Sequence, residues 1–351
     1  MMTAPPQILT HYLLEVADRR GQHGYSHALS TVATALKLIS AMVSRGSLIL
    51  SPESFTNPGV TEELNEARRL KSTRIVLEQA ATCGEIAAVS FSDESIIYQV
   101  TQGAPYLLSI DVMHHTITLA ENQPIGIAFS ITERKSGTET VTEADFLRAG
   151  TEQLSAGFAL FGPVSVLILT TGEGVDGFTL DQSVGDYVLT SPSIAIPEDS
   201  DVLAVDLSHA QSWSPPLRRY VDERIRSSQA QGGRRCTMRW NNSAILGAFR
   251  VLMNGGLFML PESDQGGLIP LLHTAQPLSM LIEQAGGQST DGANRIATIC
   301  PKSLTHRVPI VFGAPDDIQT IEAYSSGHDT SDEPEGNYPL FHNRTIYIRG
   351  D

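Results

Sequence analysis

The sequence predicts an α/β fold, on three observations. Apolar side chains recur at helical spacing through residues 7–45, and short strand-like runs begin near residue 85. Two later apolar segments end at glycine pairs, Gly255-Gly256 and Gly286-Gly287, and a glycine in this position is typical of a helix C-terminus. A chain of 351 residues with both kinds of element is long enough to bury a large core.

Three helices are predicted in the N-terminal part of the chain. The positions that define the first two are Ile8, Tyr12, Leu13, Val16, Ala35, Leu38, Ile39 and Met42. Gly21 and Gly24 interrupt the pattern between them, and Ser30-Thr31 is expected to cap the second helix because hydroxyl side chains accept from free backbone amides there. The third helix is expected over residues 63–82.

The middle of the chain reads mainly as strands. Strands are expected at residues 85–89, 95–100, 106–110, 125–131 and 164–170. Residues 177–180 and 186–190 are expected to pair as antiparallel strands through the turn at 181–185. One helix, residues 146–158, is predicted between these strands.

The C-terminal part returns to helices. They are expected at residues 215–228, 242–253 and 278–285, the first with Pro215 in its first turn, where proline is well tolerated. Residues 308–313 read as a last core strand. Residues 325–338 are acidic and rich in Gly, Ser and Pro, which predicts a linker, and residues 340–349 are strand-like.

Composition excludes several classes of partner. The net charge of −15 opposes nucleic acid or anionic membranes as a binding partner, because both require clustered Lys and Arg. Cys83, Cys236 and Cys300 are far apart and predict neither a disulfide framework nor paired metal ligands. No signal peptide and no apolar run near 20 residues is evident, so a cytoplasmic protein with a small-molecule ligand is expected.

Several segments, in their serial order, resemble class I fructose-1,6-bisphosphatase from about residue 8 to residue 324. The clearest are AGFALFG at 156–162, GGLFMLP at 255–261, EQAGG at 283–287 and HRVPIVFGAPDD at 306–317. The resemblance implies a layered α/β/α/β/α sugar-phosphatase fold and a homo-oligomer, a dimer or tetramer. We expect an N-terminal half over residues 1–200, a C-terminal α/β half over 201–324, and a tail over 325–351.

The resemblance also locates the family's metal ligands, most of which are replaced in this chain. An acidic pair, an Asp-Pro-Leu-Asp-Gly-Ser-Ser turn and a late Glu would hold Mg²⁺ in the family. Here the turn keeps Asp111, but its next positions are His114, His115 and Thr116, and the late Glu falls at Thr274. The acidic pair aligns with Ser90-Phe91, and a small shift brings Asp93 and Glu94 into its place. Hard cations require several carboxylate oxygens, so Mg²⁺-dependent hydrolysis is not expected.

The substrate positions that the resemblance implies have changed as well. The phosphate-binding Lys falls at Leu268, an Asn falls at Asp206, and the tyrosines fall at His209, Trp240 and Leu260. Arg239 is retained; in the family this arginine reaches across a subunit interface. Arg239 and Trp240 suit an anionic or aromatic ligand through forked hydrogen bonds and stacking, or an interface contact.

Three functions fit this pattern, and the sequence favours the first. It is a repurposed, metal-independent enzyme acting on a small molecule in the old cleft, without a cofactor. Its catalytic candidates are Asp111, His114, His115 and His209, and its substrate-binding candidates are Asp206, Arg239, Trp240 and Thr274. The second is a non-catalytic regulatory or scaffold homologue. The third is a divergent sugar phosphatase that uses a transition metal, since imidazole is a poor ligand for Mg²⁺. Each histidine also has a purely structural interpretation.

Overall fold

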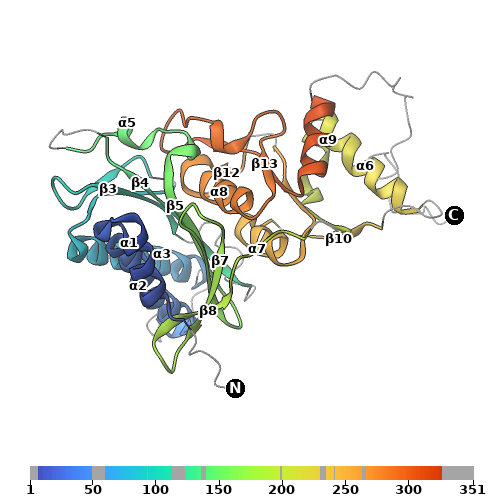
Figure 1. Cartoon of the computed structure of the whole chain (residues 1–351). Coiled ribbons are helices and arrows are strands. Elements are labelled where there is room, and N and C mark those ends of the chain that lie inside the picture. The colour runs from blue at the N-terminus through green and yellow to red at the C-terminus, as the bar shows by residue number, and fades with distance from the viewer. Residues whose placement is uncertain are drawn as a thin grey trace.

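The described residues form two large β-sheets, a two-stranded ladder and layers of helices that cover the large sheets (Figure 1). The computed structural model describes residues 7–49, 60–92, 94–112, 123–135, 140–197, 200–229, 235–240, 242–262 and 266–325. The predicted linker beyond residue 325 and the strand-like run at 340–349 therefore lie outside the described residues.

The larger sheet has eight strands in the order β2-β1-β3-β4-β5-β6-β7-β8. They are β1 (Ile86–Phe91), β2 (Ile97–Gln99), β3 (Tyr106–Val112), β4 (Ile125–Glu133), β5 (Gln153–Phe161), β6 (Ser165–Thr170), β7 (Asp176–Asp181) and β8 (Asp186–Ser191). Only β1 and β3 run parallel, and the remaining neighbours are antiparallel. The predicted hairpin is present as β7 and β8.

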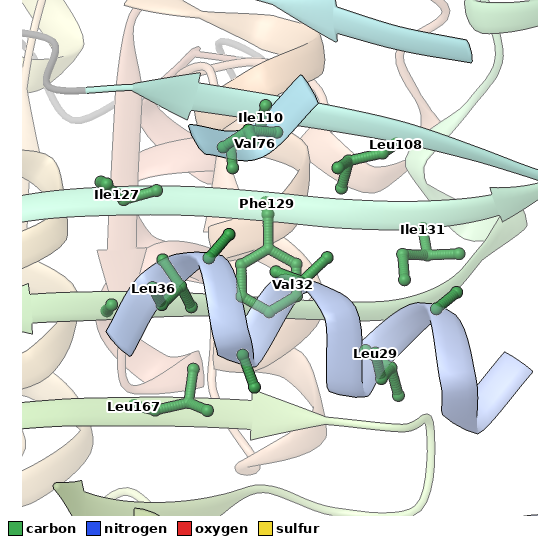
Figure 2. Close-up of a cluster of buried hydrophobic side chains, with 14 of the residues drawn as sticks. Leu29, Val32, Leu36, Val76, Leu108, Ile110, Ile127, Phe129, Ile131 and Leu167 are labelled. Carbon is green, nitrogen blue, oxygen red and sulfur yellow. The ribbon is translucent and has the colours of Figure 1, made fainter. Parts of the chain in front are cut away.

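Three helices cover one face of this sheet: α1 (Leu9–Arg20), α2 (His23–Val43) and α3 (Val60–Cys83). Figure 2 shows Leu29, Val32 and Leu36 of α2 lying over Phe129 of the sheet, within a large buried apolar cluster. This packing explains why apolar side chains recur at helical spacing along α1 and α2.

Helix α2 differs from expectation in two ways. It begins at His23, so Ser30 and Thr31 lie inside it, where the Thr31 hydroxyl donates to the His27 carbonyl at 2.9 Å and caps nothing. By length and composition alone, it is also the only helix among the described residues that could cross a membrane. Its apolar side chains are part of the core cluster, which identifies it as a core helix.

The helix predicted at residues 146–158 is wrong. A short helix α5 (Glu143–Phe146) and a 3₁₀ turn η3 (Gly150–Glu152) precede β5, which occupies most of this range. Nearly every residue of β5 is buried, because helices cover both faces of the sheet there. A strand buried on both faces has a continuous apolar run, and periodicity cannot distinguish such a run from a buried helix.

The second sheet has five strands in the order β10-β9-β11-β15-β13. They are β9 (Val202–Val205), β10 (Thr237–Arg239), β11 (Leu257–Leu260), β13 (Gln288–Thr290) and β15 (Ile310–Gly313). Strands β9, β10 and β11 are parallel, and β15 is antiparallel to its neighbours. A small ladder joins β12 (Ile269–Pro270) to β14 (Arg307–Val308).

Two helices, α7 (Ala244–Asn254) and α8 (Gln276–Gln284), form the layer between the sheets. Their apolar side chains share one cluster with Phe158 of the first sheet and with Phe258 of the second. Helices α6 (Pro215–Gln229) and α9 (Pro315–Ser325) cover the outer face of the second sheet. The layers are therefore α/β/α/β/α, as the resemblance implied.

Candidate functional site

Asp111 lies near the end of β3, on the face that points away from the N-terminal helices. Side chains alternate along a strand, and Leu108, Ile110 and Val112 belong to the cluster under those helices. Asp111 therefore faces the middle layer, where it is only 1% exposed. A buried carboxylate needs hydrogen-bond donors, and the residues around it supply them.

A π-helical turn, η5 (Leu271–Ala275), brings one of these donors to the strand. The Thr274 hydroxyl donates to Oδ2 of Asp111. The Ser92 hydroxyl, just beyond β1, donates to Oδ1 at 2.6 Å. Both carboxylate oxygens of Asp111 thus accept from hydroxyl groups of the protein. The sequence placed Thr274 at this site through the resemblance but missed Ser92.

A second polar pair lies next to the first. Ser90 on β1 and His273 on η5 precede Ser92 and Thr274, and Ser90 Oγ lies 2.8 Å from Nε2 of His273. Both side chains are fully buried. Sequence reasoning missed His273, although its position beside Thr274 was a usable signal. We call Ser90, Ser92, Asp111, His273 and Thr274 the polar cluster.

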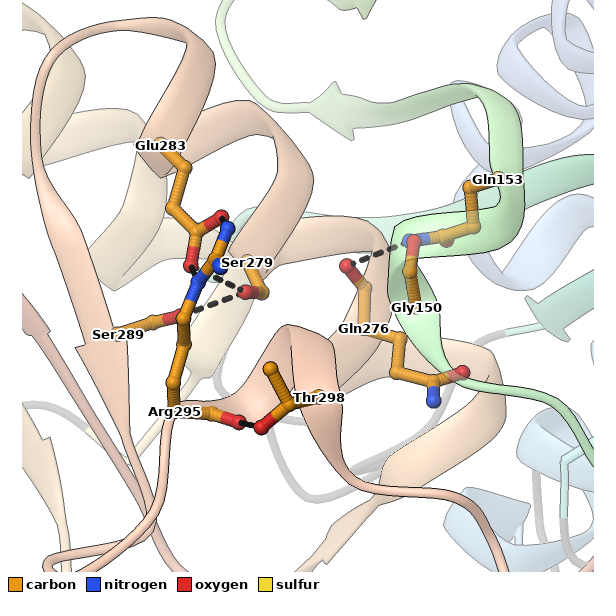
Figure 3. A network of polar contacts seen from close by, with 8 residues as sticks. All are labelled: Gly150, Gln153, Gln276, Ser279, Glu283, Ser289, Arg295 and Thr298. Atoms are coloured by element: carbon orange, nitrogen blue, oxygen red, sulfur yellow. Dashed lines mark hydrogen bonds and ion pairs between the residues drawn. The ribbon is translucent and has the colours of Figure 1, made fainter.

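Neighbouring contacts hold η5 in place. Helix α8 follows it directly, and the Gln153 side chain of β5 donates to the backbone oxygens of Gly150 and Gln276 at 2.9 and 3.1 Å (Figure 3). At the other end of α8, Glu283 forms an ion pair with Arg295 at 2.6 Å. The Gln153 bonds fix the start of α8 against the first sheet, and with it the position of Thr274.

The polar cluster does not fit a Mg²⁺ cage. Asp111 is its only carboxylate, and each of its oxygens accepts a hydrogen bond from a hydroxyl group. Glu94 points elsewhere: it forms an ion pair with Arg69 at 2.9 Å and accepts from the Tyr98 hydroxyl. Within the described ranges, no three or more His, Cys, Asp or Glu side chains converge in a way that could hold a metal ion. Asp93, the other acidic candidate, lies outside those ranges.

The structure places a second group of candidates at one edge of the smaller sheet. Asp206 directly follows β9. Arg239 is the last residue of the neighbouring parallel strand β10, where it pairs in register with Ala204, and Trp240 directly follows it. Parallel strands end at the same edge, so these three residues share it. Arg239 and Trp240 are exposed, Trp240 by 71%.

The histidine candidates are only partly placed. The backbone of His209 belongs to the 3₁₀ turn η4 (Leu207–Ser212), which follows Asp206, but its side chain is outside the described residues. His114 and His115 are wholly outside them. Leu268, where the resemblance led us to expect the replacement of a phosphate-binding lysine, packs against the core between the sheets.

Comparison with known proteins gives a consistent result. The fructose-1,6-bisphosphatase N-terminal domain model matches residues 7–192, and the C-terminal domain model of the same enzyme matches residues 196–326. The Leishmania major fructose-1,6-bisphosphatase in its T-state is similar in fold, with a TM-score of 0.81 and 23% identity over 92% of this chain and 100% of that one. The holo form of the Leishmania enzyme also has a TM-score of 0.81, with 24% identity over 91% and 99% of the two chains. The layered fold, the order of its strands and the two matching domain models together show that this chain belongs to the fructose-1,6-bisphosphatase family.

Proposed function

We propose that this chain does not perform the Mg²⁺-dependent phosphate hydrolysis of its family, and that the ancestral metal position has become structural. The observation that carries the proposal is the hydrogen bonding of Asp111. Its oxygens accept from Ser92 and Thr274 in a site that is 1% exposed. A metal ligand must direct lone pairs at the ion, whereas each oxygen of Asp111 directs a lone pair at a protein hydroxyl group instead.

Charge supports the same proposal. A divalent ion held by one carboxylate and neutral hydroxyl groups would lack the compensating negative charge that hard cations require. Thr274 supplies a hydroxyl where the resemblance implies a Glu, and Ser90 supplies another at the first position of the implied acidic pair.

A non-catalytic role, as a regulatory or scaffold homologue, is the function that this geometry supports best. The other four residues of the polar cluster are bonded to Asp111 or to one another, and Ser90 and His273 are fully buried. The polar cluster therefore stabilises the contact between β1, β3 and η5. A group committed to such contacts is poorly placed to move a proton to a substrate.

A metal-independent enzyme, which the sequence favoured, is the second candidate. The observation in its favour is the shared edge of β9 and β10, where Asp206, Arg239 and Trp240 lie together. In sheets of this kind, ligands bind beyond the carboxyl ends of parallel strands. His209 follows in the next turn and would be its acid–base group, together with His114 or His115.

Phosphate release decides the main proposal. Purified protein should release inorganic phosphate from fructose 1,6-bisphosphate far more slowly than about one per second with Mg²⁺, Mn²⁺ or Zn²⁺. Replacing both positions, His114→Asp with Thr274→Glu, should restore little activity because His115 and Thr116 still lack the family's phosphate-binding turn. Turnover of about one per second or faster in the unmodified protein would overturn the proposal.

The same preparation separates the two remaining roles. A library of small metabolites is screened for turnover and for a rise in melting temperature. Turnover that disappears in His209→Ala or His114→Ala would establish the enzyme. Ligand- or protein-induced stabilisation without any turnover would establish the non-catalytic role.

A further inference from the structure

Helix α3 carries an arginine on its buried side. Every fourth residue of its inner stripe is buried, and these residues are Leu64, Arg68, Ser72, Val76 and Ala80. The helical repeat places such residues above one another on one face. Arg68 is only 4% exposed, so its guanidinium group enters the interior rather than the solvent.

Arg68 has no counter-ion within the described part of the chain. Its Nε and Nη1 atoms are buried and make no hydrogen bond there. Burial alone lowers the pKa of Arg68, with no acidic neighbour to oppose it. The next arginines on α3 are different: Arg69 pairs with Glu66 and Glu94, and Arg74 pairs with Glu78. A buried charge without a partner is strongly unfavourable, so a compensating anion is needed.

The helix geometry shows where this charge lies. Helix α3 ends at Cys83 and β1 begins at Ile86, so the two elements run in opposite directions. Arg68 is therefore about 22 Å back along the helix from Cys83, close to the length of about 20 Å expected for β1. The ion pair between Arg69 and Glu94, which lies beyond β1, agrees with this position at 2.9 Å. Arg68 thus lies level with the carboxyl ends of β1 and β3.

The position is separate from the polar cluster. Asp111 and Ser90 face the middle layer, whereas α3 packs against the opposite face of the sheet. One turn before Arg68, the side-chain amide of Asn65 has a buried oxygen that makes no hydrogen bond to the described residues. Rotating that amide by half a turn would put its NH₂ group, a hydrogen-bond donor, where its oxygen now lies.

We propose that Arg68 anchors a binding site for a small oxyanion, the phosphate or carboxylate group of a small molecule. The guanidinium group presents its N–H donors in a planar fork that matches two oxygens of such a group, and the side-chain amide of Asn65 adds a neutral donor. The site explains why an arginine stands in a stripe of otherwise apolar or hydroxyl-bearing residues. It does not depend on the function proposed above.

Thermal unfolding with inorganic phosphate, and separately with acetate, tests the proposal. Sodium chloride at equal ionic strength serves as the reference, because phosphate also stabilises proteins non-specifically. Wild-type protein should show a saturable rise in melting temperature with at least one anion. A larger rise in melting temperature with phosphate, the tetrahedral anion, indicates that the ligand is a phosphate. A larger rise with acetate, the planar anion, indicates a carboxylate.

Two variants locate the effect. Arg68→Met should weaken the anion response about tenfold or more. Its melting temperature without anion should be no lower than that of the wild type, because the unpaired charge is gone. Arg74→Met is the matched control from the same helix, since Arg74 is 80% exposed, and it should respond as the wild type does.

Three results would overturn the site. They are an equal anion response in Arg68→Met and wild type, the absence of any saturable response to either anion, and a loss of the response in Arg74→Met as large as in Arg68→Met. If Arg68→Met does not fold, calorimetric titration of Arg68→Lys replaces it. Lysine keeps the charge but not the fork, so affinity for the anion equal to the wild-type value would then contradict the proposal.

Discussion

The hydroxyl of Thr274 donates a hydrogen bond to the carboxylate of Asp111, although 163 residues separate them in the chain. The bond joins the eight-stranded sheet to the helical layer that it shares with the second sheet. It also engages the only carboxylate of the polar cluster. Stability, rather than chemistry, is therefore the property on which this pair should be tested first.

Thr274→Val should reduce the free energy of unfolding by about 1–3 kcal/mol, because it removes a donor from a buried carboxylate. Urea unfolding measures the change. Thr298→Val is the control, since the Thr298 hydroxyl donates only to a local carbonyl on the surface. Equal losses in the two variants would show that Asp111 does not depend on Thr274.

Asp222→Asn should become more stabilising as the pH rises. Burial raises the pKa of Asp222, with a contribution from Glu223, and Arg226 and Arg218 only partly oppose the rise. A carboxyl group with a raised folded-state pKa favours folding below its unfolded-state value of about 3.9 and loses that contribution as the pH rises through the folded-state value. In urea unfolding from about pH 4 to pH 8, the free energy of unfolding of the variant should therefore rise relative to that of the wild type.

Asp181→Asn supplies the opposite sign as a control for that titration. Hydrogen bonds from the Ser183 hydroxyl and amide lower the pKa of Asp181, which is at the surface. The free energy of unfolding of Asp181→Asn should not rise relative to that of the wild type as the pH rises. A pH-independent difference for Asp222→Asn would mean that the Asp222 carboxyl is not penalised by burial.

Gly157→Ala should destabilise the fold by about 1–3 kcal/mol through overpacking. A Cβ atom there would lie 2.6 Å from the Phe129 ring and 2.8 Å from the Ile168 carbonyl oxygen. Gly162→Ala, just beyond the same strand, would meet nothing closer than Pro124 at 3.4 Å and should be nearly neutral. Chemical denaturation compares the two, and similar midpoints would contradict the packing at β5.

Light scattering should show a dimer or tetramer at micromolar concentration. The retained Arg239 is the basis of this expectation, and the adjacent Trp240 is a reporter because it is 71% exposed in the single chain. The other tryptophan, Trp213, is buried, so Trp213→Phe leaves one emitting group. Its emission should shift to longer wavelength on dilution, and a monomeric mass at every concentration would contradict the expectation.

The sequence predicted most helices and strands because their apolar periodicity matched their surroundings. It was wrong where the surroundings removed the periodicity, as at β5, which is buried on both faces. It was also wrong about Ser30 and Thr31, since hydroxyl groups inside a helix can bond to the preceding turn as readily as they cap one.

The candidate site was predictable only where a position could be transferred from the family. Asp111 and Thr274 were located in that way, and the structure brings them together. Ser92 and His273 were missed because their roles depend on contacts between residues far apart in the chain, and a single sequence does not record such contacts. No local pattern distinguishes Arg68 from an ordinary surface arginine on a polar helix either.

The helical layer shared by the two sheets has a consequence for how the chain can be divided. Ala128 and Phe158 of the first sheet belong to the same buried cluster as Ala248 and Leu278 of the second half. A cut between residues 197 and 200 would leave each fragment with a large uncovered apolar face. Each fragment should then be insoluble when produced alone, and the two should form a soluble complex when produced together.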